Sequence, residues 1–231
     1  MKQRDIIRFI GDTHGWVNTY TDIIKRYPKY SIQMGDFGFE YEWKKLVETV
    51  DGNFHKILAG NHDDYDYIRN IKPIHNLGDF GEYTVDNTTM FFVRGGLSID
   101  KHLRIQGKSW WMEEELDFMQ QSKCIQKYKK VKPDFVITHV PPECYLEELH
   151  EDARVIQSTT GQLLSMLYEI HQPKLWIYAH MHPQKTFINP INNTNFICLA
   201  IKDYIDYDLK ITLDENIECF KNTIIETLIK R

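Results

Sequence analysis

Five apolar runs in this chain each end in an aspartate, an asparagine or a histidine. The first run, residues 6–10, leads directly into the sequence Gly-Asp-Thr-His-Gly at residues 11–15. The residues that end the five runs are, in order, Asp12 with His14, Asp36, Asn61, His139, and His180 with His182. Short apolar runs bounded by turn residues predict buried strands. Because ligands bind at the carboxyl ends of strands in an open α/β sheet, the pattern predicts one polar site assembled from several strand ends.

The segments around these runs indicate an α/β fold. The first sixty residues alternate strands and helices, which is typical of βαβ units. We expect strands at residues 6–10, 30–34, 55–59, 83–85, 90–93, 134–138 and 174–179, and helices at 19–27, 42–50, 113–129 and 160–171. The tail predicts strands at 186–188, 195–199, 208–213 and 217–220, with a hairpin turn at 214–216. No repeat or linker interrupts residues 1–231, so we expect a single domain with a long excursion at 94–111.

The composition limits the partners of this protein. The 231 residues carry a formal net charge of −5. Proteins whose main role is to bind nucleic acid usually show a basic surface, so this charge argues against such a role. A nuclease is still compatible with it, because bound divalent cations add positive charge at the site. No segment resembles a signal peptide or reaches the length of a membrane span. The four cysteines are scattered, and we therefore expect a cytoplasmic protein with reduced thiols and no membrane partner.

The polar residues at the strand ends form a metal-binding set. One such junction alone is equally typical of an ordinary turn. Five of them, which together contain five of the ten histidines, favour one shared binding site. The set contains carboxylates, imidazoles and one amide but no thiolate, which points to Mn²⁺, Fe, Zn²⁺, Ni²⁺ or Co²⁺. Seven ligands exceed the needs of one ion. Two ions about 3.5–4 Å apart, sharing one carboxylate, fit the number better.

The order of these motifs resembles that of the calcineurin-like metallophosphoesterases. That family carries D-x-H, G-D, G-N-H-[DE], H and G-H-x-H, and this chain has G-D-T-H-G, G-D, G-N-H-D, T-H and A-H-M-H in the same order. Ala179 stands where the family usually has glycine, which changes no ligand. The resemblance runs from residue 5 to about residue 183 and implies two mixed sheets packed together between helices.

The resemblance also implies roles for the seven ligands. The first metal ion would be held by Asp12, His14, Asp36 and His182. The second would be held by Asp36, Asn61, His139 and His180, with Asp36 bridging, and manganese is our first expectation for both. A hydroxide between the ions would attack phosphorus in line, because metal binding lowers the pKa of water toward about 7.

The same comparison implies an acid catalyst next to the metals. In the family, the histidine of G-N-H-[DE] is not a ligand but assists the leaving oxygen, and its acidic neighbour orients it. By match these residues are His62 and Asp63. General acid help of this kind contributes about 10²–10⁴-fold to the rate. The alternative for His62 is a structural histidine that only supports the ligands.

The substrate is less constrained. The protein phosphatase branch of the family carries an arginine in G-D-x-x-D-R-G that binds phosphate, and residues 35–40 here lack it. Arg94 and Arg104 are candidate substrate-binding residues, with Lys101 and Lys108 as further cations of the excursion. The excursion resembles a segment of small phage and bacterial family members. Its adjacent Trp110 and Trp111 either stack an aromatic group of the substrate or cap the core.

Three functions remain open. The first is a two-metal hydrolase acting on a phosphomonoester, with a phosphorylated small molecule, a nucleotide or a phosphoprotein as substrate. The second is a phosphodiesterase or nuclease acting on nucleotides or nucleic acid. The third is a non-catalytic scaffold of the same fold, which is less favoured because none of the ligands is missing. The oligomeric state is open, and the predicted tail hairpin would provide an edge for a second copy.

Overall fold

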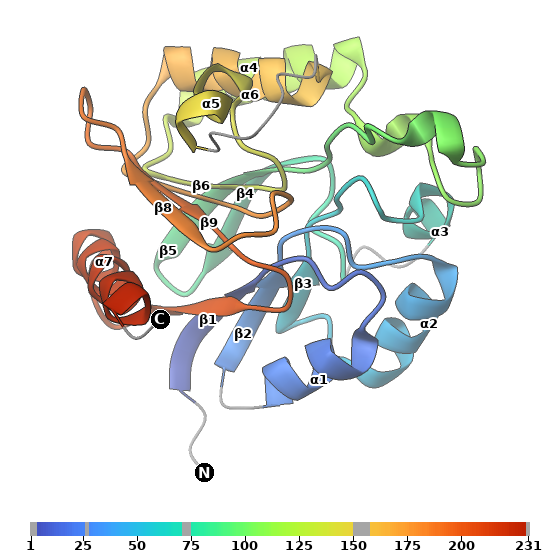
Figure 1. Cartoon of the computed structure of the whole chain (residues 1–231), viewed down its shortest axis with the longest axis horizontal. Helices are drawn as coiled ribbons and strands as arrows, with labels where there is room; N and C mark the ends of the chain where they lie inside the picture. The colour runs from blue at the N-terminus through green and yellow to red at the C-terminus, as the bar shows by residue number, and fades with distance from the viewer. Residues whose placement is uncertain (1–3, 26–27, 71–74, 150–157, 230–231) are drawn as a thin grey trace.

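Two β-sheets packed against each other form the middle of the molecule (Figure 1). The computed structural model describes residues 4–25, 28–70, 75–149 and 158–229. The smaller sheet has the order β10 (Tyr204–Asp208), β1 (Arg4–Ile10), β2 (Pro28–Gln33) and β3 (His55–Ile57). The larger has the order β4 (Phe80–Val85), β5 (Thr88–Val93), β6 (Phe135–Thr138), β7 (Leu175–Tyr178), β9 (Asn195–Cys198) and β8 (Lys185–Ile188). Both are mixed: β1–β10, β4–β5 and β8–β9 are antiparallel, and the other neighbours are parallel.

Helices cover the outer face of each sheet (Figure 1). Over the smaller sheet lie α1 (Val17–Lys25), α2 (Glu40–Thr49) and α3 (Tyr65–Asn70). Over the larger sheet lie α4 (Phe118–Val131), α5 (Leu146–Leu149) and α6 (Thr159–Ile170). These four layers are the architecture that the resemblance implied, so the predicted fold class is confirmed.

Burial on both faces explains why the central strands are almost entirely apolar. In β1, Ile7 and Phe9 lie between the two sheets with Ile137 and Ile177 of the larger sheet. The next residue, Ile10, lies on the opposite face among the residues of α1 and α2. Each fully buried side chain of this size contributes about 1.5–3 kcal/mol relative to an exposed one. The apolar runs therefore hold the sheets in fixed positions, and the polar residues that follow them are fixed in turn.

The carboxyl ends of the parallel strands meet at one edge of the two-sheet sandwich, as expected. Backbone hydrogen bonds tie the loops at this edge together. His14 N donates to the carbonyl of Asp36 at 2.8 Å, and Ala179 N donates to the carbonyl of His139 at 2.9 Å. Lys202 N, after β9, donates to the carbonyl of Asp12 at 2.9 Å. Loops far apart in the sequence are thereby held against one another at the edge where the polar motifs lie.

The tail of the chain differs from the expectation. We predicted strands at 208–213 and 217–220 around a hairpin turn, but the chain forms β10 and then the helix α7 (Leu213–Ile229). Ile217 and Phe220 are buried and pack against the core between the sheets. Their spacing of three residues suits one face of a helix, not alternate residues of a strand. A helix thus occupies the place of the tail hairpin that would have offered an edge to a second copy.

Smaller differences concern element boundaries. The helix expected at 113–129 begins at residue 118, after the short turn η2 (Met112–Glu114). Asp117 caps it: the Asp117 carboxylate accepts a bond from Gln120 N, and Gln120 Oε1 accepts one from Asp117 N. The excursion is ordered around the turn η1 (Lys101–Leu103). Among the described residues, no helix combines the length and the apolar character needed to cross a membrane.

Candidate metal centre

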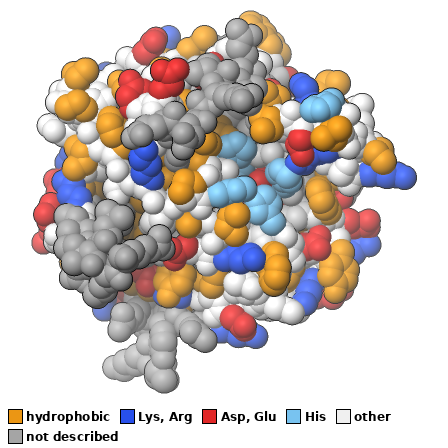
Figure 2. Space-filling model, in the orientation of Figure 1, with side chains coloured by type: hydrophobic (Ala, Val, Ile, Leu, Met, Phe, Trp, Pro, Cys, Tyr) orange, Lys and Arg blue, Asp and Glu red, His pale blue; other side chains and the backbone are white. Residues whose placement is uncertain are grey.

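The predicted ligands gather into two groups at the carboxyl edge of the sheets. The first group is Asp12, His14 and His182. His182 Nε2 lies 3.2 Å from Asp12 Oδ2 and 3.1 Å from His14 Nε2. His14 Nε2 lies 3.8 Å from the same carboxylate oxygen. Figure 2 shows imidazole side chains gathered near the middle of the face that carries these loops.

The second group is Asp36, His139 and His180, with Asn61 beside it. His139 Nε2 lies 3.2 Å from Asp36 Oδ1, 3.1 Å from Asn61 Oδ1 and 3.2 Å from His180 Nδ1. The other oxygen of Asp36 lies 4.0 Å from His14 Nδ1 of the first group. The Asp36 carboxylate therefore stands between the two groups.

The spacing of the donor atoms suits bound divalent ions. Ligand atoms about 2.1 Å from one ion lie roughly 3.0–3.4 Å apart in tetrahedral or octahedral geometry. Most of the distances within the two groups fall in or near this range. Asp12 Oδ2 is buried and makes no hydrogen bond of good geometry among the described residues, with the His182 imidazole as its near neighbour at 3.2 Å. A buried carboxylate oxygen is costly when it is poorly satisfied, and a cation between it and the imidazoles would satisfy it. The residues present thus fit the metals that the resemblance implied.

Four of the ligand residues have left-handed backbone conformations. The φ angles are +41° at His14, +56° at Asp36, +64° at His180 and +74° at His182. Such angles cost about 1–2 kcal/mol for a residue with a Cβ atom. The sheets and the bonds between the loops must offset this cost. These conformations turn the chain sharply after β1, β2 and β7, at the edge where the predicted ligands gather.

Charge and burial bias the protonation of the ligands. Burial alone would lower the pKa of His139, but the charge of Asp36, to which it is hydrogen-bonded, raises it to about 9. Burial, with the nearby His139 charge, lowers the pKa of His180 to about 4. The close contact with the Asp12 carboxylate raises the pKa of His182. The carboxylates thus favour the protonated form of His139 and His182, and metal binding at the same place would compete with those protons.

His62 is not one of the predicted ligands, but with His14 and Asp36 it forms a third group whose ligand atoms lie within 4.8 Å of one another. Its ring packs edge-on against that of His14, with centroids 5.2 Å apart. Its backbone N–H donates to Asp36 Oδ1 at 2.8 Å. Arg104 Nη2 lies 2.7 Å from His62 Nε2. Since a guanidinium can only donate, His62 Nε2 is the acceptor here and carries no proton. Burial, and to a smaller degree Arg104, lowers the pKa of His62.

Asp63 has a different neighbourhood from the one we expected. We predicted that it orients the His62 side chain, but its described hydrogen bonds go elsewhere. Its carboxylate accepts bonds from the backbone amides of Asp36, Phe37, Gly38 and Gly60 and from Trp43 Nε1. Burial and the neighbouring Asp36 charge raise the pKa of Asp63 to about 7. Asp63 thus joins the loop after β2 to the loop after β3 and acts on the site through the backbone.

Comparison with known proteins identifies the family. The model of the family described as calcineurin-like phosphoesterase matches residues 7–184, well over half of the chain. The chain belongs to the calcineurin-like phosphoesterase family. The family is one of metal-dependent phosphoesterases, and the donor groups are candidate clusters of metal ligands. No curated protein sequence matches the chain.

A solved structure shares the fold of this calcineurin-like phosphoesterase. TT1561 of Thermus thermophilus is 10% identical, with a TM-score of 0.50, and the match covers 88% of this chain and 99% of that one. Two further structures are similar at lower scores. The phosphopantetheinyl hydrolase of Mycobacterium tuberculosis is 13% identical, with a TM-score of 0.47 and coverage of 87% and 92%. A putative 5′-nucleotidase of Staphylococcus aureus is 13% identical, with a TM-score of 0.48 and coverage of 96% and 58%.

The two predicted substrate-binding arginines lie in different surroundings. Arg104 is next to His62, as described, and is also bound to Asp100, with Nε 2.8 Å from Oδ1. Arg94 is buried, donates to Asp79 Oδ1 at 2.6 Å and to the carbonyl of Glu113 at 2.6 Å, and lies over the ring of Tyr65. The described contacts of Arg94 are therefore structural, and substrate binding by it stays a prediction.

The tryptophans of the excursion lie at its base. Trp111 is buried, packs against Phe39 and donates from Nε1 to Asp66 Oδ2 at 2.8 Å. It caps the core, which was the second of the two roles considered for it. We did not predict two buried residues near Asn61: Ser98 contacts Asn61, and Glu114 contacts Ser98. Their positions at the two ends of the excursion were the only signal in the sequence.

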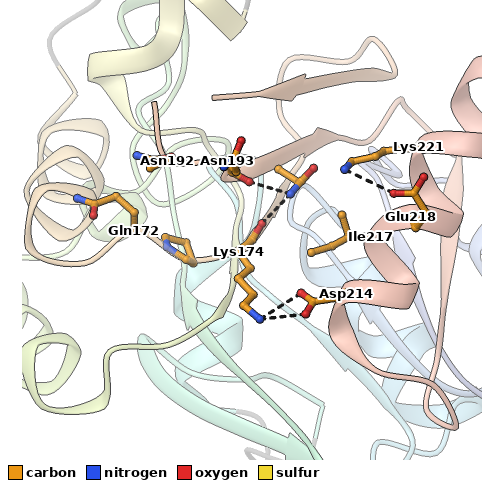
Figure 3. Close-up of a pocket in the computed structure, with 10 residues that line it drawn as sticks. Gln172, Lys174, Asn192, Asn193, Asp214, Ile217, Glu218 and Lys221 are labelled. Atoms are coloured by element: carbon orange, nitrogen blue, oxygen red, sulfur yellow. Dashed lines mark hydrogen bonds and ion pairs between the residues drawn. The ribbon is translucent and has the colours of Figure 1, made fainter. Parts of the chain in front are cut away.

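A separate cavity of about 480 Å³ lies at the other end of β7 and β9 (Figure 3). Its charged lining residues pair with one another: Lys174 Nζ lies 3.1 Å from Asp214 Oδ1, and Lys221 Nζ lies 3.7 Å from Glu218 Oε2. Lys174 precedes β7, whereas His180 and His182 follow it. The cavity and the metal centre are therefore at opposite ends of the same strands.

Proposed function

We propose that this protein is a two-metal phosphomonoesterase with His62 as its acid. The observation that carries the proposal is the pair His62 and Arg104 beside two donor groups, with the Asp36 carboxylate of the second group 4.0 Å from His14 of the first. The first ion would be held by Asp12, His14, Asp36 and His182, and the second by Asp36, Asn61, His139 and His180. Bound there, two divalent ions supply a nucleophile from water at neutral pH and neutralise charge on the phosphoryl oxygens.

The two residues of the His62–Arg104 pair would act on the two sides of the scissile P–O bond, Arg104 on the phosphoryl group and His62 on the leaving oxygen. A phosphoryl oxygen is a stronger partner for a guanidinium than a neutral imidazole, so bound phosphate draws Arg104 away from His62. His62 Nε2 is then free to take a proton from solvent water, which makes the imidazole cationic before the P–O bond breaks. That proton passes to the leaving oxygen as the P–O bond breaks, and His62 returns to its neutral form. Arg104 meanwhile balances charge on the phosphoryl group.

We expect His62→Ala to lower kcat according to the leaving group. Loss of a general acid lowers the rate of the chemical step about 10²–10⁴-fold. The loss should be larger for phenyl phosphate, whose leaving phenol has a pKa of about 10 like tyrosine, than for p-nitrophenyl phosphate, which leaves more easily without a proton. The measurement is kcat for both substrates with Mn²⁺, beside metal content of the variant. Equal losses on the two substrates, with metal content unchanged, would contradict the acid role.

Turnover of p-nitrophenyl phosphate and of its bis-ester, with Mn²⁺ and after chelation, tests the substrate class. Metal-dependent preference for the monoester supports the proposal. The net charge of −5 also favours this outcome over a nuclease. Preference for the bis-ester replaces the proposal with a phosphodiesterase. Absence of bound metal in the purified and metal-treated protein indicates a scaffold.

Replacing Arg104 should weaken binding of a monoester. A hydrogen bond to a charged group contributes about 1.5–3 kcal/mol, so we expect Arg104→Met to raise KM for p-nitrophenyl phosphate roughly 10–100-fold. The bis-ester, with one negative charge fewer, should be affected less. Lys101→Met, three residues earlier and exposed, is the matched control. If both variants raise KM equally, Arg104 contributes only positive charge to the surface and makes no specific contact with phosphate.

A further inference from the structure

Both polar atoms of the Asn61 side chain have described partners. Its Oδ1 lies 3.1 Å from His139 Nε2, within the second ligand group. Its Nδ2 donates to Ser98 Oγ at 3.2 Å. An amide has one oxygen and one nitrogen at its end, and only the oxygen binds a divalent cation. A flip of the amide would therefore remove a ligand from the second ion.

Glu114 determines which way the Ser98 hydroxyl points. Ser98 Oγ donates to Glu114 Oε2 at 2.6 Å, and Ser98 N donates to Glu114 Oε1 at 2.8 Å. Both residues have about 1% of their surface exposed. Since the hydroxyl has a single proton and gives it to Glu114, its oxygen can only accept from Asn61. The amide is thus forced to present its nitrogen to Ser98 and its oxygen to His139.

We propose that Ser98 and Glu114 are positioning residues that hold Asn61 Oδ1 toward the second metal ion. The inference rests on the two-ion site proposed above. Groups that orient a metal ligand typically contribute 10–100-fold to metal affinity. The chain Glu114–Ser98–Asn61 is buried throughout, so water cannot easily replace any of its bonds.

The same bonds join the excursion to the metal centre. Glu114 follows the excursion and Ser98 lies near its start, so one carboxylate fixes both ends. The carbonyl of Glu114 also accepts from Gly96 N at 3.1 Å. Glu114 therefore fixes the position of the excursion that carries Arg104 and, through Ser98, also orients Asn61. Affinity for the second ion and the position of Arg104 depend on one contact.

Glu114→Gln tests this role with almost no change of shape. The glutamine offers one oxygen and one NH₂ group, while Ser98 needs two acceptors. When the NH₂ group faces Ser98 Oγ, the hydroxyl proton turns toward Asn61 and favours the flipped amide. We expect the Kd for the second ion to rise about 10–100-fold, with the first ion changed less than about threefold. Glu113→Gln, at the half-exposed neighbouring glutamate that pairs with Arg69 at 3.1 Å, is the matched control.

The measurement is titration of the metal-free protein with Mn²⁺ by calorimetry and by paramagnetic resonance, together with Tm. Loss of affinity at one of two sites in Glu114→Gln, and likewise in Ser98→Ala, supports the inference. A lower Tm with both affinities unchanged, or with both reduced equally, assigns the two residues a structural role and overturns it. Wild-type protein that binds no ion, or only one, overturns the two-ion proposal itself.

Discussion

Asp36→Asn should remove most of the activity and weaken the first ion more than the second. Asp36 Oδ1 accepts the His62 N–H at 2.8 Å, so the asparagine must keep its oxygen at that position. Its NH₂ group then replaces Oδ2, the oxygen on the side of His14. An NH₂ group cannot bind a cation. The second ion keeps an amide oxygen, whereas the first loses a ligand and gains a repulsive neighbour.

The size of this effect follows from charge. Asp36 is one of two carboxylates among the seven predicted ligands, and it alone stands between the groups. The metal contribution to transition-state stabilisation is several kcal/mol, so we expect kcat/KM to fall roughly 10³-fold or more. The measurements are metal content and kcat/KM on p-nitrophenyl phosphate. Asp51→Asn, at an exposed turn that keeps its bond to Asn53 N, is the control and should change neither.

An Asp36→Asn variant that keeps two tightly bound ions and near-normal turnover would be strong evidence against a bridging carboxylate. Retained turnover with one ion lost would instead indicate that a single metal suffices. Normal metal content with turnover lost places the role of Asp36 in the reaction step. The three outcomes are distinguishable because metal content and rate are measured separately.

The location of the site could be predicted because it depends on local patterns. Each ligand follows an apolar run, and burial fixes where that run lies. The fold then brings the strand ends together, as it does for Asp12 and His182, which are 170 residues apart and 3.2 Å apart in space. What the pattern could not provide is the left-handed backbone at His14 and Asp36, which depends on long-range bonds between loops.

The error in the tail also has a physical explanation. A short segment with few apolar residues fits a strand or a helix nearly equally well. The helix α7 is favoured by a cap that we overlooked: Thr212 N donates to Glu215 Oε2, and Glu215 N donates to Thr212 Oγ1. This pair is visible in the sequence as Thr-x-x-Glu. The packing of Ile217 against the core between the sheets is not.

The contacts of Asp63, Arg94 and Glu114 could not be predicted at all. Asp63 binds backbone amides of the loop after β2, and Arg94 pairs with Asp79. Glu114 reaches Ser98 across the excursion. In each case the partner is set by where a loop folds, and no periodicity or spacing records it. Family resemblance predicts which residues gather at the strand ends, because the fold fixes those ends, but it predicts supporting contacts poorly because they belong to loops.

Gly60→Ala should destroy the metal centre although it adds a single methyl group. A Cβ atom at Gly60 would overlap the Asp36 carboxylate and lie 2.7 Å from His139 Nε2. Neither neighbour can move away easily. Asp36 N is bound to Asp63 Oδ2, and His139 Nδ1 is bound to the carbonyl of Met34. Gly60 itself is fixed by bonds from its N–H to Asp63 and to its carbonyl from the Tyr65 hydroxyl.

The methyl group therefore enters the space between the bridging carboxylate and a ligand of the second ion. Overpacking of this kind costs about 1–3 kcal/mol of stability, and the displacement of Asp36 affects both ions at once. We expect Mn²⁺ binding at both sites to be lost together with turnover, while the fold persists. Circular dichroism and Tm report the fold, and calorimetric titration reports the metals.

Gly161→Ala is the matched control for the same substitution. Gly161 is buried in the first turn of α6, where a Cβ atom would lie 3.2 Å from Glu143 Cβ and touch no predicted ligand. Alanine is favoured over glycine in a helix by about 0.8–1.0 kcal/mol, which opposes the cost of the close contact with Glu143, so we expect a small change in Tm with metal binding intact. If Gly60→Ala also keeps both ions, the loop after β3 yields more readily than its bonds imply. The Asp36 carboxylate would then have to bind the ions from a different position. If only Gly60→Ala loses them, the close approach of the backbone to Asp36 and His139 is what requires glycine there.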